Sequence, residues 1–467
     1  MRALLAVSDT TGLVDLATGL RALGWELIAT EEAAKALKAE GIDAGSEGLV
    51  KMDKLGLVAV SLASPDGPPV DVDLEAPAML RAAAKDYEST IVLCDATDYE
   101  PTLAALKDGG LSGEQRRELA AKAFTRVALY DTLIARALRD NAAAMPDELT
   151  IALKKRPDLE LRYGENPHQA GALYLEAGAQ EAGVSGYRRL HGIPMSFNNV
   201  LDADAAWRAA IDFPDPTVVV VKHLNPCGLA SHEDLEVAYE RALAGDPMSA
   251  FGGIVACNRP IDVELARTMR ASVSPSSGQR MRYDLIIAPG YSEDALAELS
   301  KWRDVRILKV PEGDAFTYDL RRVSGGFLLQ EADRKPDDTL ELKVASQREP
   351  TEEELADLRF AWRVCKHVKS NAIVLVKDRA LLGMGAGQPN RVTSVHLAVQ
   401  RAGERARGSV LASDAYFPFF DGMAVAAAAG VAAAAEPGGS VRDAEVIAIA
   451  DAAGMALVFT GERHFRH

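Results

Sequence analysis

The stretch Thr217-Val-Val-Val-Val-Lys222 decides the fold of the longer part of this chain. Four consecutive valines favour a β-strand that is buried on both faces. His223 follows directly, and Asn225-Pro-Cys-Gly228 then turns the chain away from the strand. A second strand of this kind is expected at Ala372–Val376. Each strand belongs to a block of strand and helix, so the sequence predicts two α/β subdomains that meet between residues 330 and 352.

The part of the chain before about residue 135 shows a different alternation. Short apolar strands are expected at Ala3–Val7, Glu26–Ala29, Leu57–Ser61 and Thr90–Cys94, with helical stretches between them. This spacing is typical of a parallel sheet in a small α/β domain. A more polar stretch, Asp140–Asp158, then leads into a different composition. We place the main domain boundary in that stretch.

Composition limits the possible classes of function. The 467 residues are 48% hydrophobic and 26% charged, which is ordinary for a globular protein of two or three domains. The net charge of −16 argues against a nucleic-acid partner, although a local group of Arg and Lys can still bind one phosphate. No window is apolar enough to span a bilayer, and the start has too short an apolar run for a signal peptide. The four cysteines, Cys94, Cys227, Cys257 and Cys365, form no C-x-x-C pair, so we expect a protein of the reducing cytoplasm.

Lys222 and His223 are the first candidates for chemistry, because they lie where a buried strand ends. In α/β sheets, ligands bind at the carboxyl ends of strands. A neighbouring lysine disfavours protonation of an imidazole, so His223 can act as a base near pH 7. The alternative is a pair of side chains that only faces solvent.

Three further segments carry weaker signals. Asn371, at the start of the second buried strand, either donates to a developing oxyanion or caps the preceding helix. Gly383–Gln388 is expected to form a glycine-rich turn before a helix, where Arg391 would add positive charge to an anion-binding helix start. The tail Arg463–His467 is either frayed or docked by the strand predicted at Ala456–Thr460.

The sequence lacks the signature of a zinc deaminase, which requires H-x-E followed by P-C-x-x-C. His223 is followed by Leu224 and Asn225, and Cys227 is followed by Gly-Leu-Ala. We therefore predict no catalytic metal.

Eight segments, taken in this order, resemble a single family. They are Arg162-Tyr-Gly-Glu-Asn-Pro-His-Gln169, Ser196-Phe-Asn-Asn-Val-Leu-Asp202, Val221-Lys-His-Leu-Asn-Pro-Cys-Gly228, Asp246-Pro-Met-Ser-Ala-Phe-Gly-Gly253, Lys366-His-Val-Lys-Ser-Asn371, Gly383-Met-Gly-Ala-Gly-Gln388, Ser413-Asp-Ala-Tyr-Phe-Pro-Phe419 and Arg463-His-Phe-Arg-His467. The family is the bifunctional purine-biosynthesis protein that combines aminoimidazole carboxamide ribotide (AICAR) formyltransferase with inosine monophosphate (IMP) cyclohydrolase. The resemblance runs from about residue 158 to the last residue.

The resemblance implies the reaction and the residues that perform it. A formyl group would pass from the co-substrate 10-formyltetrahydrofolate to the 5-amine of AICAR. The residues implied in catalysis are Lys222, His223, Asn371 and Asp421. Those implied in binding the nucleotide are Arg162, Tyr163, His168, Asp284, Arg391, Arg463 and His467, and those implied near the folate are Phe417 and Phe419.

The resemblance also implies the architecture and the assembly. A small domain similar to methylglyoxal synthase, residues 1–140, would precede two formyltransferase subdomains similar to cytidine deaminase without its zinc, residues 150–345 and 346–467. Members of the family it resembles form homodimers with formyltransferase sites at the subunit interface. Three alternatives stay open: a nucleotide-binding paralogue without catalysis, another amino-imidazole acceptor, and free formate as the donor.

The amino-terminal part departs from the family at the elements that the resemblance associates with ring closure. Thr10 stands where the family's opening V-S-D-K-T-G-L has its lysine, and Ala29-Thr-Glu-Glu-Ala33 stands where the family has the turn S-T-G-G-T. A segment of several tens of residues is missing between Lys51 and Leu57, and D-I-G-G-P-A-M reads Asp73-Leu-Glu-Ala-Pro-Ala-Met79. Carboxylates in place of glycines repel a phosphate, so we predict loss of cyclohydrolase activity. The alternative is a fully bifunctional enzyme with a rebuilt site.

Overall fold

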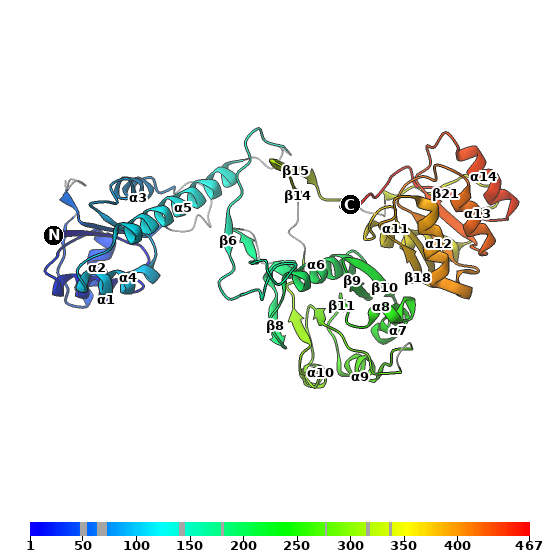
Figure 1. The fold of residues 1–467 in the computed structure, drawn as a ribbon, viewed down its shortest axis with the longest axis horizontal. Helices are drawn as coiled ribbons and strands as arrows, with labels where there is room; N and C mark the ends of the chain where they lie inside the picture. Colours follow the sequence, from blue (N-terminus) through cyan, green and yellow to red (C-terminus); the bar gives the residue numbers. More distant parts are fainter. Residues whose placement is uncertain are drawn as a thin grey trace. The chain divides into compact units, whose positions relative to one another are not determined.

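The computed structural model describes residues 1–46, 54–62, 72–139, 145–178, 182–275, 278–313, 318–335 and 339–467. Within this part the chain forms two compact units: unit 1 takes residues 1–155 with the short segment 174–179, and unit 2 takes the rest. Both units combine strands and helices, which confirms the predicted α/β class (Figure 1). Among the described residues, no helix is long and apolar enough to cross a membrane.

Unit 1 contains a five-stranded sheet in the order β3-β2-β1-β4-β5, and every pairing in it is parallel, as the sequence predicted. The strands are β1 (Arg2–Ala6), β2 (Glu26–Ala29), β3 (Gly45–Ser46), β4 (Leu57–Val60) and β5 (Ile91–Leu93). The helices are α1 (Leu13–Ala22), α2 (Glu31–Ala39), α3 (Glu75–Lys85), α4 (Tyr99–Lys107) and α5 (Gly113–Leu138). A short hairpin, β6 (Leu153–Lys155) with β7 (Tyr174–Glu176), also belongs to this unit.

Unit 2 contains a twelve-stranded mixed sheet and a separate hairpin. The first half of the sheet consists of β8 (Arg188–His191), β9 (Thr217–Lys222), β10 (Asn225–Ser231), β11 (Ile254–Cys257), β12 (Leu285–Ala288) and β13 (Arg306–Lys309). The second half consists of β16 (Lys343–Val344), β17 (Ile373–Lys377), β18 (Ala380–Gly385), β19 (Val410–Ser413), β20 (Ala433–Glu436) and β21 (Ala456–Phe459). Antiparallel pairing of β10 with β18 joins the halves, and β14 (Tyr318–Val323) with β15 (Gly326–Glu331) forms the hairpin.

Helices cover both faces of this sheet. One face packs against α6 (Phe197–Ile211) and α11 (Glu352–Lys366). The other face packs against two groups of helices, one from each half of the sheet: α7 (Leu235–Gly245), α9 (Val263–Ala271) and α10 (Glu293–Leu299), and then α12 (Arg391–Ala402), α13 (Asp421–Ala428) and α14 (Asp443–Ala452). The short helix α8 (Pro247–Ala250) follows α7. The division of unit 2 near residue 345 stays a prediction.

Strand β9 lies between these two layers, as its four valines predicted. Val219 and Val221 pack toward α6 and α11, whereas Val218 and Val220 pack toward the opposite layer. None of the four is more than 1% exposed. Strand β20 is buried in the same way although three of its four residues are alanines, because it lies between the parallel strands β19 and β21. Its position therefore compensates for the poor strand propensity of alanine.

The first half of the glycine-rich segment Gly383–Gln388 is not part of the predicted turn, because Gly383 and Gly385 belong to strand β18, whereas residues 386–390 lie outside any helix or strand and lead to α12. A Cβ atom on Gly385 would lie 2.1 Å from the carbonyl oxygen of Ser394, and one on Gly383 would lie 2.3 Å from that of Ala398. Both carbonyls belong to α12. The glycines therefore let the backbones of a strand and a helix approach each other closely, instead of forming an anion-binding loop.

We expect Gly385→Ala to lower the free energy of unfolding of unit 2 by ~2 kcal/mol or more, because α12 has to move away from β18 to make room. Gly326→Ala is the matched control, since a Cβ there meets no atom within 4 Å, and its effect should stay within ~0.5 kcal/mol. Urea unfolding followed by circular dichroism measures both. Equal effects of the two substitutions would contradict close packing as the role of Gly385.

Candidate active site

The residues predicted to be catalytic lie along one edge of the twelve-stranded sheet. Lys222 ends β9, Asn371 precedes β17, and Asp421 begins α13 after the loop that leaves β19. Strand β9 is antiparallel to β10, β10 to β18, β18 to β17, and β17 to β19. This alternation brings the end of β9, the start of β17 and the end of β19 to the same side. The two strands next to β9 are antiparallel to it. The carboxyl end of β9 at Lys222 is therefore not flanked by the carboxyl ends of parallel strands.

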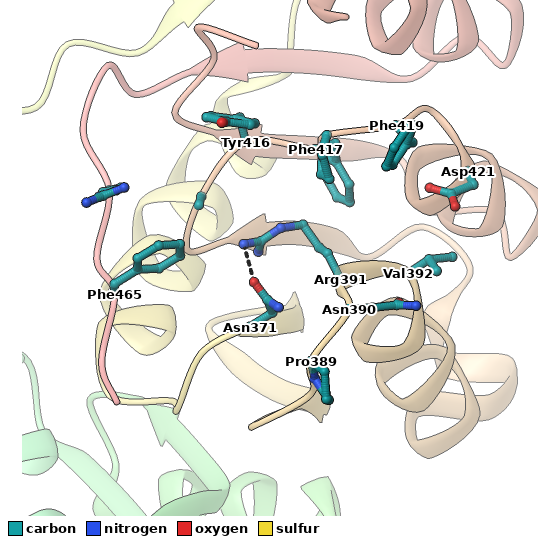
Figure 2. Close-up of a pocket in the computed structure, with 13 residues that line it drawn as sticks. Asn371, Pro389, Asn390, Arg391, Val392, Tyr416, Phe417, Phe419, Asp421 and Phe465 are labelled. Atoms are coloured by element: carbon teal, nitrogen blue, oxygen red, sulfur yellow. Dashed lines mark hydrogen bonds between the residues drawn. The ribbon is translucent and has the colours of Figure 1, made fainter.

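A pocket of about 550 Å³ opens at this edge, beside β17 and β19. Six predicted site residues line it: Asn371, Arg391, Phe417, Phe419, Asp421 and Arg463. In Figure 2, Phe417 and Phe419 lie on one side of the pocket and Asn390 lies on the other. The volume falls within the range of small-molecule sites, ~300–1,000 Å³, and the walls combine aromatic rings with cationic and amide groups.

The side-chain amide of Asn371 is fixed in one orientation. A guanidinium can only donate, so Oδ1 of Asn371 faces Arg391 and accepts a hydrogen bond of 2.7 Å. The Nδ2 group donates to the carbonyl oxygen of Gln388 at 2.8 Å, and among the described residues its second hydrogen has no further acceptor. Helix α11 ends at Lys366 and its C-cap is His367, so the alternative that Asn371 caps this helix is wrong.

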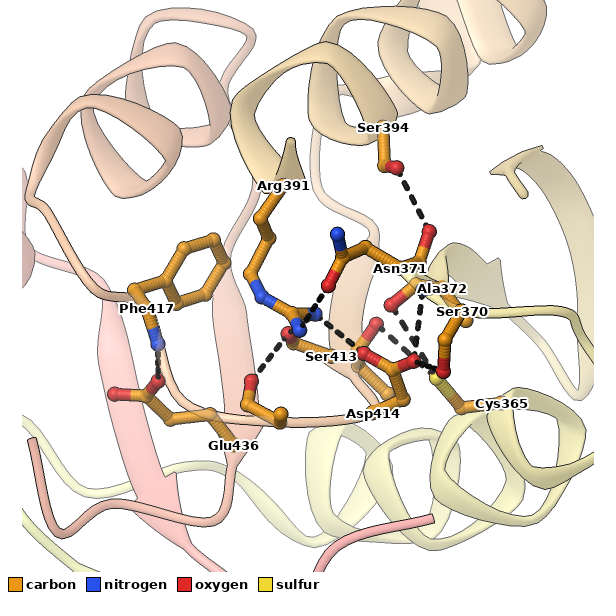
Figure 3. Close-up of polar contacts among 12 residues, drawn as sticks. Cys365, Ser370, Asn371, Ala372, Arg391, Ser394, Ser413, Asp414, Phe417 and Glu436 are labelled. Atoms are coloured by element: carbon orange, nitrogen blue, oxygen red, sulfur yellow. Dashed lines mark hydrogen bonds and ion pairs between the residues drawn. The ribbon is translucent and has the colours of Figure 1, made fainter. Parts of the chain in front are cut away.

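A buried ion pair supports this amide. Arg391 and Asp414 are 6% and 0% exposed, and the guanidinium donates to the carboxylate and, at 2.8 Å, to Oγ of Ser413. The carboxylate also accepts from the hydroxyl of Ser370 and, at 2.9 Å, from the N–H of Ala372 (Figure 3). A buried pair is stable only when such additional hydrogen bonds satisfy its charges. Asp414 was not predicted to be a functional residue, although it lies in one of the quoted motifs.

Phe417 and Phe419 differ in exposure. Phe417 is 1% exposed and forms a wall of the pocket, whereas Phe419 is 51% exposed, with the guanidinium of Arg442 4.9 Å from its ring centre. The N–H of Phe417 donates to Oε2 of Glu436 at 2.6 Å. Glu436 is fully buried, and its Oε1 has no hydrogen-bond partner among the described residues. Burial raises the pKa of the Glu436 carboxyl to about 7.

Lys222 and His223 lie at the tip of the β9–β10 hairpin. The half-buried Lys222 donates from Nζ to the carbonyl oxygen of Phe251 at 2.6 Å, whereas the ring of His223 is exposed. The alternative prediction was that both side chains face solvent. It holds for His223 but not for Lys222. Asn225 connects this turn to the segment before Asn371: its Nδ2 donates to the His223 carbonyl at 3.0 Å, and its Oδ1 accepts from the N–H of Lys369 at 3.2 Å.

A second group of predicted residues surrounds Arg306. Arg306 itself was not predicted from the sequence. Arg306 is 5% exposed and donates to the backbone carbonyls of Pro194 and Asp284 at 3.0 and 3.2 Å. Burial lowers the pKa of Arg306; the charge of Arg162 adds to this effect and that of Asp284 opposes it. The guanidinium of Arg162 lies 5.3 Å from the ring centre of Tyr163. Arg162, Tyr163 and Asp284 therefore lie around Arg306.

Two further predicted residues, His168 and His467, lie outside the pocket, the hairpin tip and the group around Arg306, although the tail of the chain is docked. His168 is exposed in a loop, and His467 is exposed with its carbonyl accepting from Arg321 at 2.6 Å. The frayed tail is wrong as an alternative, because His464 is buried with Nδ1 2.6 Å from Asp333. The carbonyl of Arg466 also accepts the N–H of Ser370 at 2.9 Å. In the part of the chain that the structure describes, no group of three His, Cys, Asp or Glu side chains is placed to bind a metal ion.

Known proteins resemble this chain along its whole length. A sequence profile of the AICARFT/IMPCHase bienzyme family matches residues 83–401. A Bacillus cereus (strain G9842) protein named "Bifunctional purine biosynthesis protein PurH" is 39% identical, over 100% of this chain and 99% of that protein. A protein of the same name from Xanthomonas axonopodis pv. citri (strain 306) is 40% identical, over 100% of this chain and 98% of that protein. The chain belongs to the AICARFT/IMPCHase bienzyme family.

One solved structure is also similar in sequence. The protein described as "Crystal structure of ForH" is 30% identical, and the match covers 30% of this chain and 98% of that chain. Its TM-score of 0.27 is too low to support a structural argument.

This member of the bienzyme family is shorter than its relatives. The alignments with the two PurH proteins run over 519 and 526 positions, whereas this chain has 467 residues. Both relatives therefore contain residues that have no counterpart here. This agrees with the segment predicted to be missing between Lys51 and Leu57, where residues 47–53 lie outside the described part.

Glu31 and Glu32 of unit 1 occupy the positions at which the bienzyme family has two glycines, whereas Asp9, which the family's opening also contains, precedes Thr10 at the position of the family's lysine. Glu31 and Glu32 form the exposed first turn of α2, where a helix N-terminus would otherwise attract an anion. Asp9 follows β1, and hydrogen bonds from the Oγ1 and N–H of Thr11, at 2.7 and 2.9 Å, lower the pKa of its carboxyl. The acidic side chains of Glu31 and Glu32 disfavour a phosphate at the start of α2.

We expect Glu436→Gln to stabilise unit 2 at alkaline pH. Because the folded state binds the proton of Glu436 with a pKa of about 7 instead of 4.5, the wild type loses stability as pH rises through this interval and no further above it. The substituted protein lacks this loss, so its free energy of unfolding relative to the wild type should rise by up to ~3 kcal/mol between pH 4.5 and 7.5. Urea unfolding at a series of pH values measures the difference.

Glu404→Gln, at an exposed glutamate, is the control for this comparison, and its difference from the wild type should not depend on pH. A stability difference for Glu436→Gln that is constant across the interval would show that folding does not raise the pKa of Glu436.

Proposed function

We propose that this protein is an AICAR formyltransferase of purine biosynthesis, which transfers the formyl group of 10-formyltetrahydrofolate to the 5-amine of AICAR. The observation that carries the proposal is the pocket that Asn371, Arg391, Phe419, Asp421 and Arg463 line together. An amide donor, the cation of Arg463 and an exposed aromatic ring in one cavity suit an anionic nucleotide and a flat folate ring. Membership of the bienzyme family adds support.

The reaction requires a base, because the imidazole ring and the carboxamide withdraw the lone pair of the AICAR amine. His223 takes a proton from this amine as its nitrogen bonds to the formyl carbon, a contribution of typically ~10²–10⁴-fold. The carbonyl oxygen becomes an oxyanion, to which the free hydrogen of the Asn371 amide donates. The bond from the formyl carbon to the folate nitrogen then breaks, and that nitrogen receives a proton. Lys222 orients the formyl donor and assists this protonation, while Asp421 maintains the network.

The nucleotide is bound by the residues that the family resemblance assigns to it. Arg162 and Arg463 are the cations for its phosphate, and Asp284 is the partner of its carboxamide. Tyr163 supports Arg162, whose guanidinium lies beside its ring. His168, Arg391 and His467 complete the assigned set, with Phe417 and Phe419 beside the folate. Asp284 favours AICAR over another amino-imidazole as the acceptor. The four residues assigned to catalysis are all present, which argues against a binding protein without catalysis: Lys222, His223, Asn371 and Asp421.

Cyclohydrolase activity is lost in this proposal, while unit 1 keeps its fold. Glu31 and Glu32 place negative charge at the start of α2, where the family has two glycines, and Thr10 replaces the family's lysine. The chain is also shorter than its bifunctional relatives. We expect the enzyme in the cytoplasm, where its four buried cysteines stay reduced.

A homodimer completes the proposal, with the β14–β15 hairpin in the interface between two copies of the chain. Among the described residues, β14 and β15 pair only with each other, and an isolated two-stranded hairpin is marginally stable in water. Phe327 and Leu328 on β15 are 60% and 62% exposed. An exposed apolar pair on a hairpin without a sheet favours burial against a second subunit.

Incubation of the purified protein with AICAR and 10-formyltetrahydrofolate tests the reaction. We expect formyl-AICAR to accumulate without IMP, resolved by chromatography, because formyl transfer is retained and ring closure is lost. Formation of IMP at an enzymatic rate would show that unit 1 is active. Absence of folate turnover would refute formyl transfer.

His223→Ala tests the role of the proposed base in the same assay. This variant should lower kcat by ~10²–10⁴-fold while the protein stays folded. Near-native turnover of His223→Ala at saturating substrates would refute its role as the base.

Replacement of Phe327 and Leu328 by glutamate should shift the protein from dimer to monomer, because charged side chains oppose burial of the hairpin. Sedimentation velocity measures the mass. Val441→Glu is the matched control, since Val441 is a fully exposed apolar residue of the same unit, and this variant should stay dimeric. A dimer that survives both glutamates would place the interface elsewhere.

A further inference from the structure

The two halves of the large sheet contain the same unusual hairpin. His223 and Leu224 join β9 to β10 with φ angles of 51° and 64°, and Asp378 and Arg379 join β17 to β18 with φ angles of 52° and 53°. Two consecutive positive φ angles are typical of a type I′ turn, in which Gly and Asn are favoured. Asp378 is of a type that such turns favour, but Leu224 and Arg379 are not, because their side chains clash with the backbone in the left-handed conformation. Another interaction therefore has to hold each turn.

In each half that interaction is a carboxylate from the helix that precedes the hairpin. Asp357 of α11 accepts the N–H of Arg379 at 2.7 Å and the N–H of Asp378 at 2.9 Å. Asp202 of α6 accepts the N–H of Leu224 at 2.8 Å. Each aspartate is the sixth residue of its helix. The two carboxylates thus occupy equivalent positions in the two halves.

The two turns differ in what they carry. Because β10 and β18 are antiparallel, the turns lie at opposite edges of the sheet. The second turn contacts only structural partners in the described part: Arg379 pairs with Asp215 at 3.0 Å, and the carbonyl of Asp378 accepts from Arg241 at 3.0 Å. The first turn carries His223 and, through Asn225, contacts the segment before Asn371.

We propose that Asp202 is a positioning residue of the formyltransferase site, whose carboxylate fixes the turn that presents His223 to the substrate. This inference rests on the proposed function. Asp202 is partly buried beneath the turn and makes no contact with the pocket, so it acts through the backbone of Leu224. A shift of this turn moves the imidazole, and through Asn225 it also disturbs the segment that leads to Asn371.

Three single variants separate positioning from folding. Asp202→Ala removes the acceptor and should lower kcat for formyl transfer by ~10- to 100-fold, with KM for both substrates within ~3-fold of the wild type. Asp202→Asn keeps an oxygen acceptor and should retain most of kcat. Asp357→Ala removes the equivalent carboxylate from the turn without site residues, so it should lower the melting temperature but leave kcat unchanged.

A fourth variant tests the backbone geometry directly. Glycine adopts positive φ without strain, so Leu224→Gly in the Asp202→Ala background should restore kcat by several-fold. Wild-type kcat in Asp202→Ala, an equal loss in Asp357→Ala, or no recovery on adding Leu224→Gly would each overturn the proposal.

Failure of the proposed function would give a different result. In that case the wild type itself does not turn over AICAR and formyl-folate, whatever the residue at position 202. Hydrogen exchange at the amide of Leu224 is independent of activity. This amide should lose protection in Asp202→Ala and keep it in Asp357→Ala, and unchanged protection in Asp202→Ala would refute the structural basis of the proposal.

Discussion

The ion pair between Arg391 and Asp414 is the interaction on which the candidate site depends. It joins the start of helix α12 to the end of strand β19, and through Ser370 and Ala372 it also fixes the start of β17. Both charges are buried, so loss of either partner would leave the other unpaired at a cost of ~3–5 kcal/mol. The same guanidinium orients the amide of Asn371. The same ion pair therefore holds these strand ends together and orients the proposed oxyanion donor.

Much of the fold could be predicted from the sequence, because local patterns determine it. The bounds of β2 and β9 are those expected from apolar runs and turn residues, and the alternating strands of unit 1 form the expected parallel sheet. Glycine was harder to interpret. Gly383 and Gly385 could belong to a loop or to a close packing of backbones, and only their contacts with α12 distinguish the two.

The site could be predicted only where motifs carry it. Asn371 stands in one of the eight segments that resemble a family, Arg391 and Asp421 closely follow two others, and the structure places all three around one pocket. Asp414, Arg306 and Asp202 could not be assigned roles in this way. Each acts through a partner that is distant in sequence, such as Arg306 with Pro194 or Asp202 with Leu224. A polar residue beside an apolar run is unremarkable in sequence until its buried partner is known.

The proposed loss of cyclohydrolase activity need not disturb the fold of unit 1. Its sheet is stabilised by apolar side chains on both faces of β1, β4 and β5, and the departures from the family at Thr10, Glu31 and Glu32 fall on exposed positions beyond strand ends. Exposed substitutions of this kind alter stability little, because they remove no buried contact. They alter phosphate binding strongly, because charge decides it. A domain can therefore keep its core while the chemistry at its edge disappears.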